Sequence, residues 1–231
     1  MKAGAILVAG GTGTRMGTTM PKQLLKLDGV TILERTLASF TGCPDIVQVV
    51  IVAAESIIGD IESITNNLGD SGTIIKVTHG GKERQDSVFN GINALDDTID
   101  TIAIHDAVRP FITPHLVSEC LRVADHYGAV SVMRPVKETI KVVRNGLVEK
   151  TPDRSTLWIT QTPQAFSREV IIEAHRNAID TRFTGTDDCM LVERIGHPVH
   201  VIEGSDMNIK ITTQADLVAA EALLKRFPEQ E

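Results

Sequence analysis

The chain has 231 residues, of which 42% are hydrophobic, and its formal net charge is −7. The acidic balance argues against a protein whose main task is binding nucleic acid, because that task usually requires a basic surface. No apolar run approaches the roughly 18 residues of a membrane span, and the run before the first glycines is too short for a secretory signal. Cys43, Cys120 and Cys189 lie far apart, which suits a reducing compartment. We therefore expect a cytoplasmic protein that contacts neither membrane nor nucleic acid.

Taken in chain order, strands and helices are predicted to alternate. Apolar runs indicate strands, and segments with apolar residues on one face indicate helices. Strands are expected at 5–9, 47–54, 73–78, 101–106, 129–135 and 197–203. Helices are expected at 31–40, 56–68, 84–95, 115–126, 167–180, 187–194 and from 213 onward. Continuous apolar strands between helices favour an α/β fold, with a mostly parallel twisted sheet and helices on both faces.

Two local signals refine this outline. Thr31 and Glu34 have the spacing of a capping box at the start of a helix. The segment 138–151 consists of two alternating halves around Asn145-Gly146, a dipeptide that favours a tight hairpin turn. No repeat or linker is evident, so we predict one domain over residues 1–231, with a projecting β-hairpin arm at about 136–160.

The segment AILVAGGTGTRMG, residues 5–17, predicts a strand that runs into a glycine-rich, phosphate-holding loop. The P-loop form is excluded, because no lysine follows the second glycine of any register. The dinucleotide form GxGxxG begins at Gly11 and Gly13, but Met16 occupies its third glycine position. Glu34 stands where that form places a ribose-binding acid. An NAD(P)-dependent oxidoreductase is therefore one alternative.

Local charge favours a third form, a loop that binds a nucleoside triphosphate. Residues 1–27 contain four basic residues, Lys2, Arg15, Lys22 and Lys26, and no acid. Arg15 and Lys22 suit a triphosphate whose charge grows during reaction. Solvated surface cations beside a tight turn are the competing interpretation. A non-catalytic protein that binds a nucleotide is a further alternative.

The stretch HDAVRP places Asp106 and Arg109 just past the end of a predicted strand, where open α/β sheets bind ligands. Asp106 suits Mg²⁺ or a sugar hydroxyl and Arg109 suits a phosphate, although the two could simply pair to fix the loop. His105 is interpreted as a packed residue at the strand end, because no second His or Cys stands at metal-ligand spacing.

Three other polar segments have ordinary structural interpretations, and the first of them also has a functional one. In GGKERQDSV, Ser87 could meet a base or phosphate, or the segment could be a turn and a helix start. In TGTDD, Thr186 is expected as a helix N-cap. In NIKITT, Lys210 is expected in or beside a strand, where exposure to solvent would be usual.

Taken together, the chain resembles the 2-C-methyl-D-erythritol 4-phosphate cytidylyltransferase family of the non-mevalonate isoprenoid pathway, from about residue 3 to 226. The ordered motifs that carry this resemblance are AGGTGTRM, MPKQ, GGKERQDSV, HDAVRP, QTPQAF, TDD and NIKIT. The resemblance implies a Rossmann-like nucleotidyltransferase fold, CTP as a substrate, Mg²⁺ as cofactor and a homodimer with interlocking arms. It also implies that the phosphate of the methylerythritol substrate attacks the α-phosphate of CTP in line and displaces pyrophosphate. Many members have an alanine where this chain has Gly10, and we expect no change of chemistry from it.

The resemblance further implies a role for each matching residue. The catalytic cations would be Arg15, Lys22 and Lys210. CTP would lie against Ala9, Gly10, Gly11, Gly13, Gly81, Arg84, Ser87, Asp106 and Ala107. The acceptor would lie against Asp106, Arg109, Thr139, Arg154, Thr162 and Thr186, with Thr139 and Arg154 reaching from the arm into the partner's site. Mg²⁺ would be held mainly by CTP phosphates, with Asp106 as the candidate protein ligand.

The acceptor itself has an alternative. Cytidylyltransferases that act on ribitol or ribulose 5-phosphate share the glycine loop, HDAVRPF, QTPQ and NIKITT. The stretches ERQDSV and DRSTLW (153–158) fit the methylerythritol branch better. Methylerythritol phosphate is therefore the expected acceptor, and a pentitol phosphate is the alternative.

Overall fold

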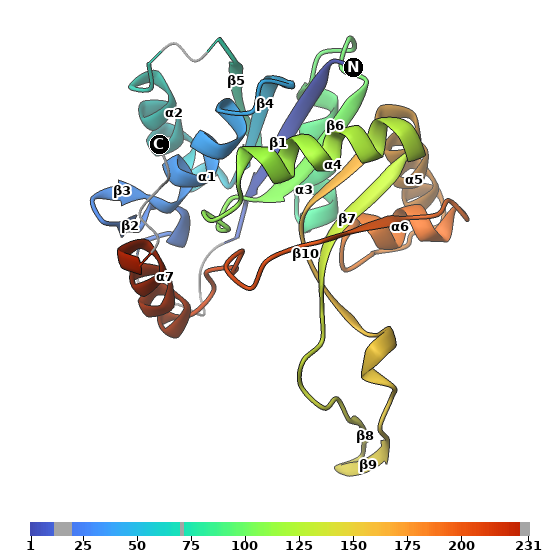
Figure 1. Cartoon of the computed structure of the whole chain (residues 1–231). Coiled ribbons are helices and arrows are strands. Elements are labelled where there is room, and N and C mark those ends of the chain that lie inside the picture. Colours follow the sequence, from blue (N-terminus) through green and yellow to red (C-terminus); the bar gives the residue numbers. More distant parts are fainter. Residues whose placement is uncertain (12–19, 70–71, 227–231) are drawn as a thin grey trace.

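A seven-stranded sheet forms the centre of the protein in the computed structural model, which describes residues 1–11, 20–69 and 72–226 (Figure 1). Its strand order is β11-β7-β10-β6-β1-β4-β5. The strands are β1 (Ala3–Ala9), β4 (Ile46–Ala53), β5 (Ile74–His79), β6 (Thr101–Asp106), β7 (Ala129–Pro135), β10 (Trp158–Ser167) and β11 (His200–Glu203). The pairs β1–β4, β1–β6, β4–β5 and β11–β7 are parallel, whereas β10 is antiparallel to both neighbours. The predicted mostly parallel α/β sheet is confirmed.

Helices cover both faces of the sheet, as alternating apolar side chains on the strands require. The helices are α1 (Ile32–Thr41), α2 (Ile58–Asn66), α3 (Arg84–Ala94), α4 (Pro114–Tyr127), α5 (Arg168–Asp180), α6 (Asp188–Arg194) and α7 (Gln214–Arg226). Leu7 of β1 belongs to the core under α1 and α4, and the neighbouring Ile6 belongs to the core under α3, α5 and α6. In Figure 1, α4 lies in front of the sheet and α3 behind it. Helix α7 packs on a third, smaller cluster with Ile32 and Val108.

The local sequence signals are confirmed. Thr31 Oγ1 accepts a hydrogen bond from Glu34 N at 3.1 Å, and Thr31 N donates to Glu34 Oε2 at 2.9 Å, which completes the capping box. Asn145 and Gly146 both have positive φ, 51° and 78°, as a tight hairpin turn requires. All three cysteines are free and buried. Within the described residues, no helix is both long enough and apolar enough to cross a membrane.

Strand β10, which inserts between β6 and β7, is not predicted by the sequence pattern. In this strand Gln164 pairs with Ile104 on one side and Ser131 on the other. The sequence WITQTPQAFS has no alternation of apolar and polar residues, because residues 160–164 contain no apolar side chain other than Pro163. A proline argues against a central strand, because it cannot donate a hydrogen bond to its neighbour. The buried polar side chains are satisfied by hydrogen bonds, such as that from Gln164 Nε2 to Asp187 Oδ2 at 2.8 Å.

Two smaller predictions differ from the structure, and some short elements were not predicted. Residues 208–213 form a loop and not a strand, so Lys210 reaches its site from irregular backbone. The N-cap of α6 is Asp187, which accepts a hydrogen bond from Met190 N at 2.9 Å, and not Thr186. The sequence also gave no signal for the short 3-10 turn η2 (Lys22–Leu24) or for the pair β2 (Lys26–Leu27) and β3 (Val30–Thr31).

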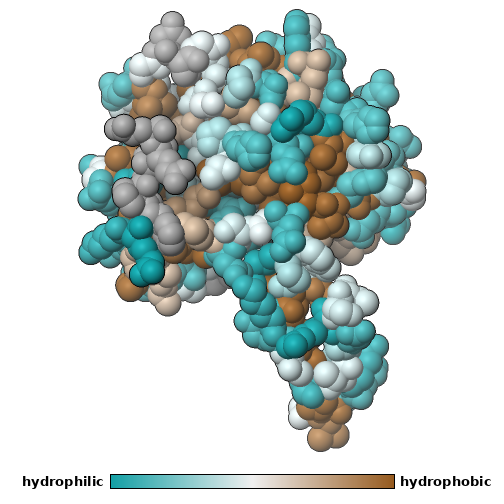
Figure 2. All heavy atoms as spheres, viewed as in Figure 1, coloured by the Kyte–Doolittle hydropathy of each residue, from teal (hydrophilic) through white to brown (hydrophobic). Residues whose placement is uncertain are grey.

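The predicted hairpin projects from the body as an arm, built from β8 (Val142–Arg144) and β9 (Leu147–Lys150), with the 3-10 turn η4 (Arg154–Thr156) on its return (Figure 1). Apolar side chains near its tip are exposed, with Leu147 at 74% and Val148 at 61% (Figure 2). Val143, which pairs with Val148 across the hairpin, is exposed as well, at 57%, and contiguous exposed apolar patches often mark interaction surfaces.

Candidate active site

A cavity of about 370 Å³ lies beyond the carboxyl ends of β1 and β6, the edge at which open α/β sheets bind ligands. The residues from the sequence prediction that line it are Gly10, Gly11, Lys22, Gly81, Arg84, Ser87, Asp106 and Lys210. A larger cavity of about 620 Å³ runs along α5 and contains none of them. Chemistry, and not volume, therefore identifies the candidate site.

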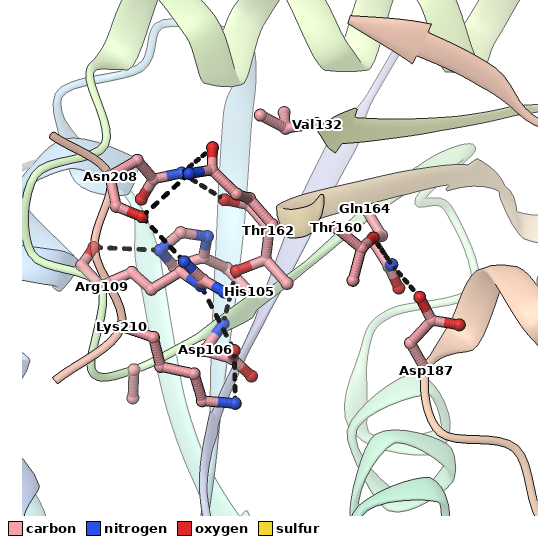
Figure 3. Close-up of polar contacts among 12 residues, drawn as sticks. His105, Asp106, Arg109, Val132, Thr160, Thr162, Gln164, Asp187, Asn208 and Lys210 are labelled. Atoms are coloured by element: carbon pink, nitrogen blue, oxygen red, sulfur yellow. Dashed lines mark hydrogen bonds and ion pairs between the residues drawn. The ribbon is translucent and has the colours of Figure 1, made fainter. Parts of the chain in front are cut away.

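Asp106 is the centre of a cationic cluster at this edge (Figure 3). Its Oδ2 lies 2.9 Å from Lys210 Nζ and 3.4 Å from Arg109 Nε, and its Oδ1 lies 3.7 Å from Arg84 Nε. Burial by itself raises the pKa of Asp106, but the Lys210, Arg84 and Arg109 charges outweigh it and hold that pKa well below its usual range. The carboxylate is therefore ionised and draws three cations to one point.

Arg109 is fixed in place by the loop that carries Lys210. Its Nη1 donates to Asn208 O at 2.7 Å, and Asn208 Nδ2 donates to Thr162 O at 2.9 Å (Figure 3). Thr162 Oγ1 in turn accepts a hydrogen bond from Asp106 N at 3.1 Å. Burial lowers the pKa of Arg109, although Asp106 opposes that effect. The polar residues of β10 thus tie Asp106 and Arg109 into one network.

His105 is a packed residue at the end of β6, as predicted. It is fully buried, lies against Phe40 with ring centroids 5.0 Å apart, and its Nε2 is 3.2 Å from Arg109 O. Burial lowers the pKa of His105 to about 4. The imidazole is therefore neutral near pH 7.

The glycine segment after β1 is held by Gln23. This residue is part of the motif MPKQ, but no role was predicted for it. Gln23 is fully buried, and its Nε2 donates to Gly11 O at 2.9 Å and also to Ala9 O. Lys22 is only 8% exposed and lies beside Gly11. The interpretation of Lys22 as a solvated surface cation is therefore wrong. Ala107 is fully buried and does not line the cavity, and its N donates to Val8 O at 3.1 Å.

The other wall of the cavity is the turn before α3. Ser87 Oγ accepts a hydrogen bond from Gly81 N at 3.0 Å and donates to Glu83 O at 3.0 Å. Arg84, the first residue of α3, points its guanidinium toward Asp106. The segment GGKERQDSV is therefore a turn and helix start, and several of its residues also line the cavity. Contact of Ser87 with a base or phosphate stays a prediction.

Some predicted residues lie away from the cavity. Thr139 and Arg154 belong to the arm, where Arg154 Nη1 donates to Lys137 O at 2.9 Å. Thr186 lies just before α6, and its Oγ1 is 3.7 Å from Met190 Sδ. Gly13 and Arg15 lie outside the described residues.

Comparison with known proteins identifies the family. The sequence profile of 2-C-methyl-D-erythritol 4-phosphate cytidylyltransferase matches residues 3–226. The chain is 43% identical over 225 residues to that enzyme of Geobacter metallireducens, covering 96% of this chain and 97% of the relative. It is 42% identical over 227 residues to that of Clostridioides difficile, covering 98% and 95%. The chain belongs to the 2-C-methyl-D-erythritol 4-phosphate cytidylyltransferase family.

Solved structures support the same assignment. The 4-diphosphocytidyl-2C-methyl-D-erythritol synthase of Anaerococcus prevotii superimposes with a TM-score of 0.86 at 30% identity, over 97% of this chain and 96% of that one. The 2-C-methyl-D-erythritol 4-phosphate cytidylyltransferase of Thermus thermophilus gives 0.77 at 30% identity, over 96% and 98%. The predicted nucleotidyltransferase fold is confirmed, and the oxidoreductase alternative is wrong. Glu34, its ribose-binding candidate, is instead engaged in the capping box of this cytidylyltransferase-family chain.

Proposed function

We propose that the chain transfers CMP from CTP to 2-C-methyl-D-erythritol 4-phosphate, giving 4-diphosphocytidyl-2-C-methyl-D-erythritol and pyrophosphate. Membership of the cytidylyltransferase family over residues 3–226 supports this reaction. The observation that carries it is the cation cluster of Arg84, Arg109 and Lys210 around Asp106, in a cavity that Lys22 also lines. Such a cluster suits two phosphorylated substrates that repel each other.

The reaction is a direct displacement. An oxygen of the acceptor phosphate forms a bond to the α-phosphorus of CTP, and the bond from that phosphorus to the oxygen bridging to the β-phosphate breaks. A phosphate monoester is largely ionised near neutral pH, since its second pKa is about 6, so no strong general base is required. The protein contributes alignment and stabilisation of charge on the α-phosphate and the leaving group. Lys22 and Lys210, with Arg15, are the cations we assign to that task.

The donor set of the cavity fits a divalent cation held mainly by substrate. Asp106 lines the cavity with both oxygens near cations, but Lys210 and Arg109 lie against Oδ2, whereas Oδ1 is 3.7 Å from Arg84 Nε, beyond hydrogen-bond distance, and is the oxygen open to a further partner. Mg²⁺ commonly takes one or two protein carboxylates and completes its shell with phosphate oxygens and water. We propose Asp106 as the protein ligand of Mg²⁺, which when bound neutralises charge on the triphosphate.

We also propose that the active form is a homodimer with exchanged arms, in which Thr139 and Arg154 reach the acceptor in the partner's site. Two observations support it: these residues lie on the arm and away from their own cavity, and the arm exposes Leu147 and Val148.

We propose a cytoplasmic location, to which three free and buried cysteines are suited.

Pyrophosphate release tests the proposed reaction. The purified chain is incubated with CTP, Mg²⁺ and, separately, 2-C-methyl-D-erythritol 4-phosphate, ribitol 5-phosphate or ribulose 5-phosphate. We expect the highest kcat/KM with the methylerythritol phosphate. A higher value with ribitol or ribulose 5-phosphate would assign the alternative acceptor, whose cytidylyltransferases share HDAVRPF and NIKITT. CTP binding without pyrophosphate release from any acceptor would instead indicate a nucleotide-binding regulator.

A further inference from the structure

Arg84 is held between two carboxylates that come from different parts of the chain. Its Nη1 lies 2.7 Å from Asp188 Oδ2, at hydrogen-bond distance, whereas its Nε lies 3.7 Å from Asp106 Oδ1. The Asp188 side chain is 1% exposed and that of Arg84 is 28% exposed. Asp188 therefore anchors Arg84 from the protein interior, and Arg84 reaches the cavity from that anchor.

On its other side the Asp188 carboxylate faces the buried imidazole of His175. The His175 Nε2 lies 3.4 Å from Asp188 Oδ1, and its side chain is also 1% exposed. The imidazole stacks on Phe89 with ring centroids 5.6 Å apart. Within the described residues neither ring nitrogen of His175 has a hydrogen-bond partner, so Asp188 is the polar group that this buried ring faces. Arg84, Asp188 and His175 thus form a row that leads inward from the cavity.

The burial of Asp188 is not explained by the start of α6. The half-buried neighbour Asp187 supplies the N-cap by accepting from Met190 N, while the Asp188 carboxylate turns inward. A buried carboxylate is costly unless it is paired. Burial by itself raises the pKa of Asp188, but Arg84 and His175 outweigh it and lower that pKa below its usual value. The inward carboxylate therefore stays charged and attracts Arg84.

We propose that Asp188 is a positioning residue of the nucleotide site, which holds the Arg84 guanidinium against the cavity wall and away from full pairing with Asp106, and that His175 fixes Asp188 in turn. Without Asp188, the nearest carboxylate for Arg84 is Asp106. The guanidinium would then close on Asp106 and leave its position in the cavity wall. The assignment of Arg84 to CTP rests on the proposed function, whereas its anchoring by Asp188 does not.

A double-mutant cycle tests the proposal. In Asp188→Asn we expect the Kd and KM for CTP to rise about tenfold, the scale of one charge-assisted hydrogen bond, with the KM for the acceptor changing less than twofold. In an Arg84→Ala background, Asp188→Asn should change the Kd for CTP less than twofold, because the residue it positions is gone. Effects that multiply in the double variant, or equal rises in both KM values, would show a merely structural role and overturn the proposal.

Asp187→Asn is the matched control. It removes the same charge one residue away and keeps a good N-cap, so CTP affinity should change less than threefold. If Asp188→Asn does not fold, His175→Leu takes its place. We expect it to raise the Kd for CTP about threefold, again only when Arg84 is present. An unchanged Kd in both substitutions overturns the proposal. A wild-type chain that binds CTP but releases no pyrophosphate would contradict the proposed function alone.

Discussion

Lys210 Nζ lies 2.9 Å from Asp106 Oδ2, which joins the loop after β11 to the end of β6. The same carboxylate faces Arg109 and, at 3.7 Å, Arg84, which Asp188 also binds, so two negative charges hold three cations that otherwise repel one another. The cations are thus in place before substrate binds, so no free energy is spent on bringing them together during the reaction. Preorganisation of this kind is a main source of catalysis in charged active sites.

Asp106→Asn should therefore destabilise the ligand-free protein and leave a site that binds small anions more tightly. We expect a loss of about 2 kcal/mol in the free energy of unfolding, less than for a fully buried pair because Lys210 is partly exposed. Denaturant unfolding at low and high salt measures it. The loss should shrink at high salt or with pyrophosphate, and a loss independent of both would contradict this account.

Lys22→Ala should lower kcat about 100-fold or more, the scale for loss of a charge-stabilising group. Lys22 is 8% exposed and lies beside Gly11, so its charge acts within the cavity. Lys26→Ala is the control, since Lys26 is exposed and does not line the cavity. Steady-state pyrophosphate release measures both variants. Near-normal turnover by a folded Lys22→Ala protein would remove Lys22 from the mechanism.

Mixing Arg154→Ala with Lys22→Ala subunits should restore part of the activity that each variant lacks. If arms are exchanged, a mixed dimer has one site with neither substitution and one site with both. With equal mixing and random pairing, about half of the dimers are mixed, so we expect about a quarter of wild-type activity. Arg154 lies on the arm, away from its own cavity. The two homodimers are the controls. Absence of recovery, despite subunit exchange demonstrated with labelled chains, would argue against a shared site.

Much of the fold was predictable because its strands are continuous apolar runs. The range 101–106 was predicted to the residue, and its position at a strand end placed Asp106 and Arg109 at the ligand edge. Strand β10 could not be predicted in this way, because its polar side chains are satisfied only by distant partners such as Asp187. The motifs MPKQ and TDD contain Gln23 and Asp188, but they gave neither residue a role, because the contacts of both depend on the assembled fold.

His105 should make stability depend on pH between about 6.5 and 4. Burial lowers its pKa to about 4 from 6.5, so in this range the unfolded chain binds a proton that the folded chain does not. The free energy of unfolding therefore does not depend on His105 above pH 6.5. Below pH 6.5 protonation of His105 in the unfolded chain lowers that free energy as pH falls toward 4, by at most about 3 kcal/mol. His105→Phe should flatten this slope. Urea unfolding of both proteins from pH 4 to 7 measures it, and parallel slopes would contradict the assignment.

Gly91→Ala should destabilise the protein by about 1–3 kcal/mol, because α3 packs tightly on the sheet at this position. A Cβ at Gly91 would lie 2.6 Å from Ile6 Cγ2 and 2.9 Å from Val52 Cγ2, both in the core, and overpacking of this degree forces side chains to move. Gly59→Ala in α2 is the matched control, since nothing lies within 4 Å of its Cβ. Alanine is the better helix former, so this change should be neutral or stabilise by up to about 1 kcal/mol. Thermal unfolding of the two variants compares them directly. Equal stability of both would mean that α3 can shift away from the sheet, and the cavity wall that begins at Arg84 would then be less rigid than its packing indicates.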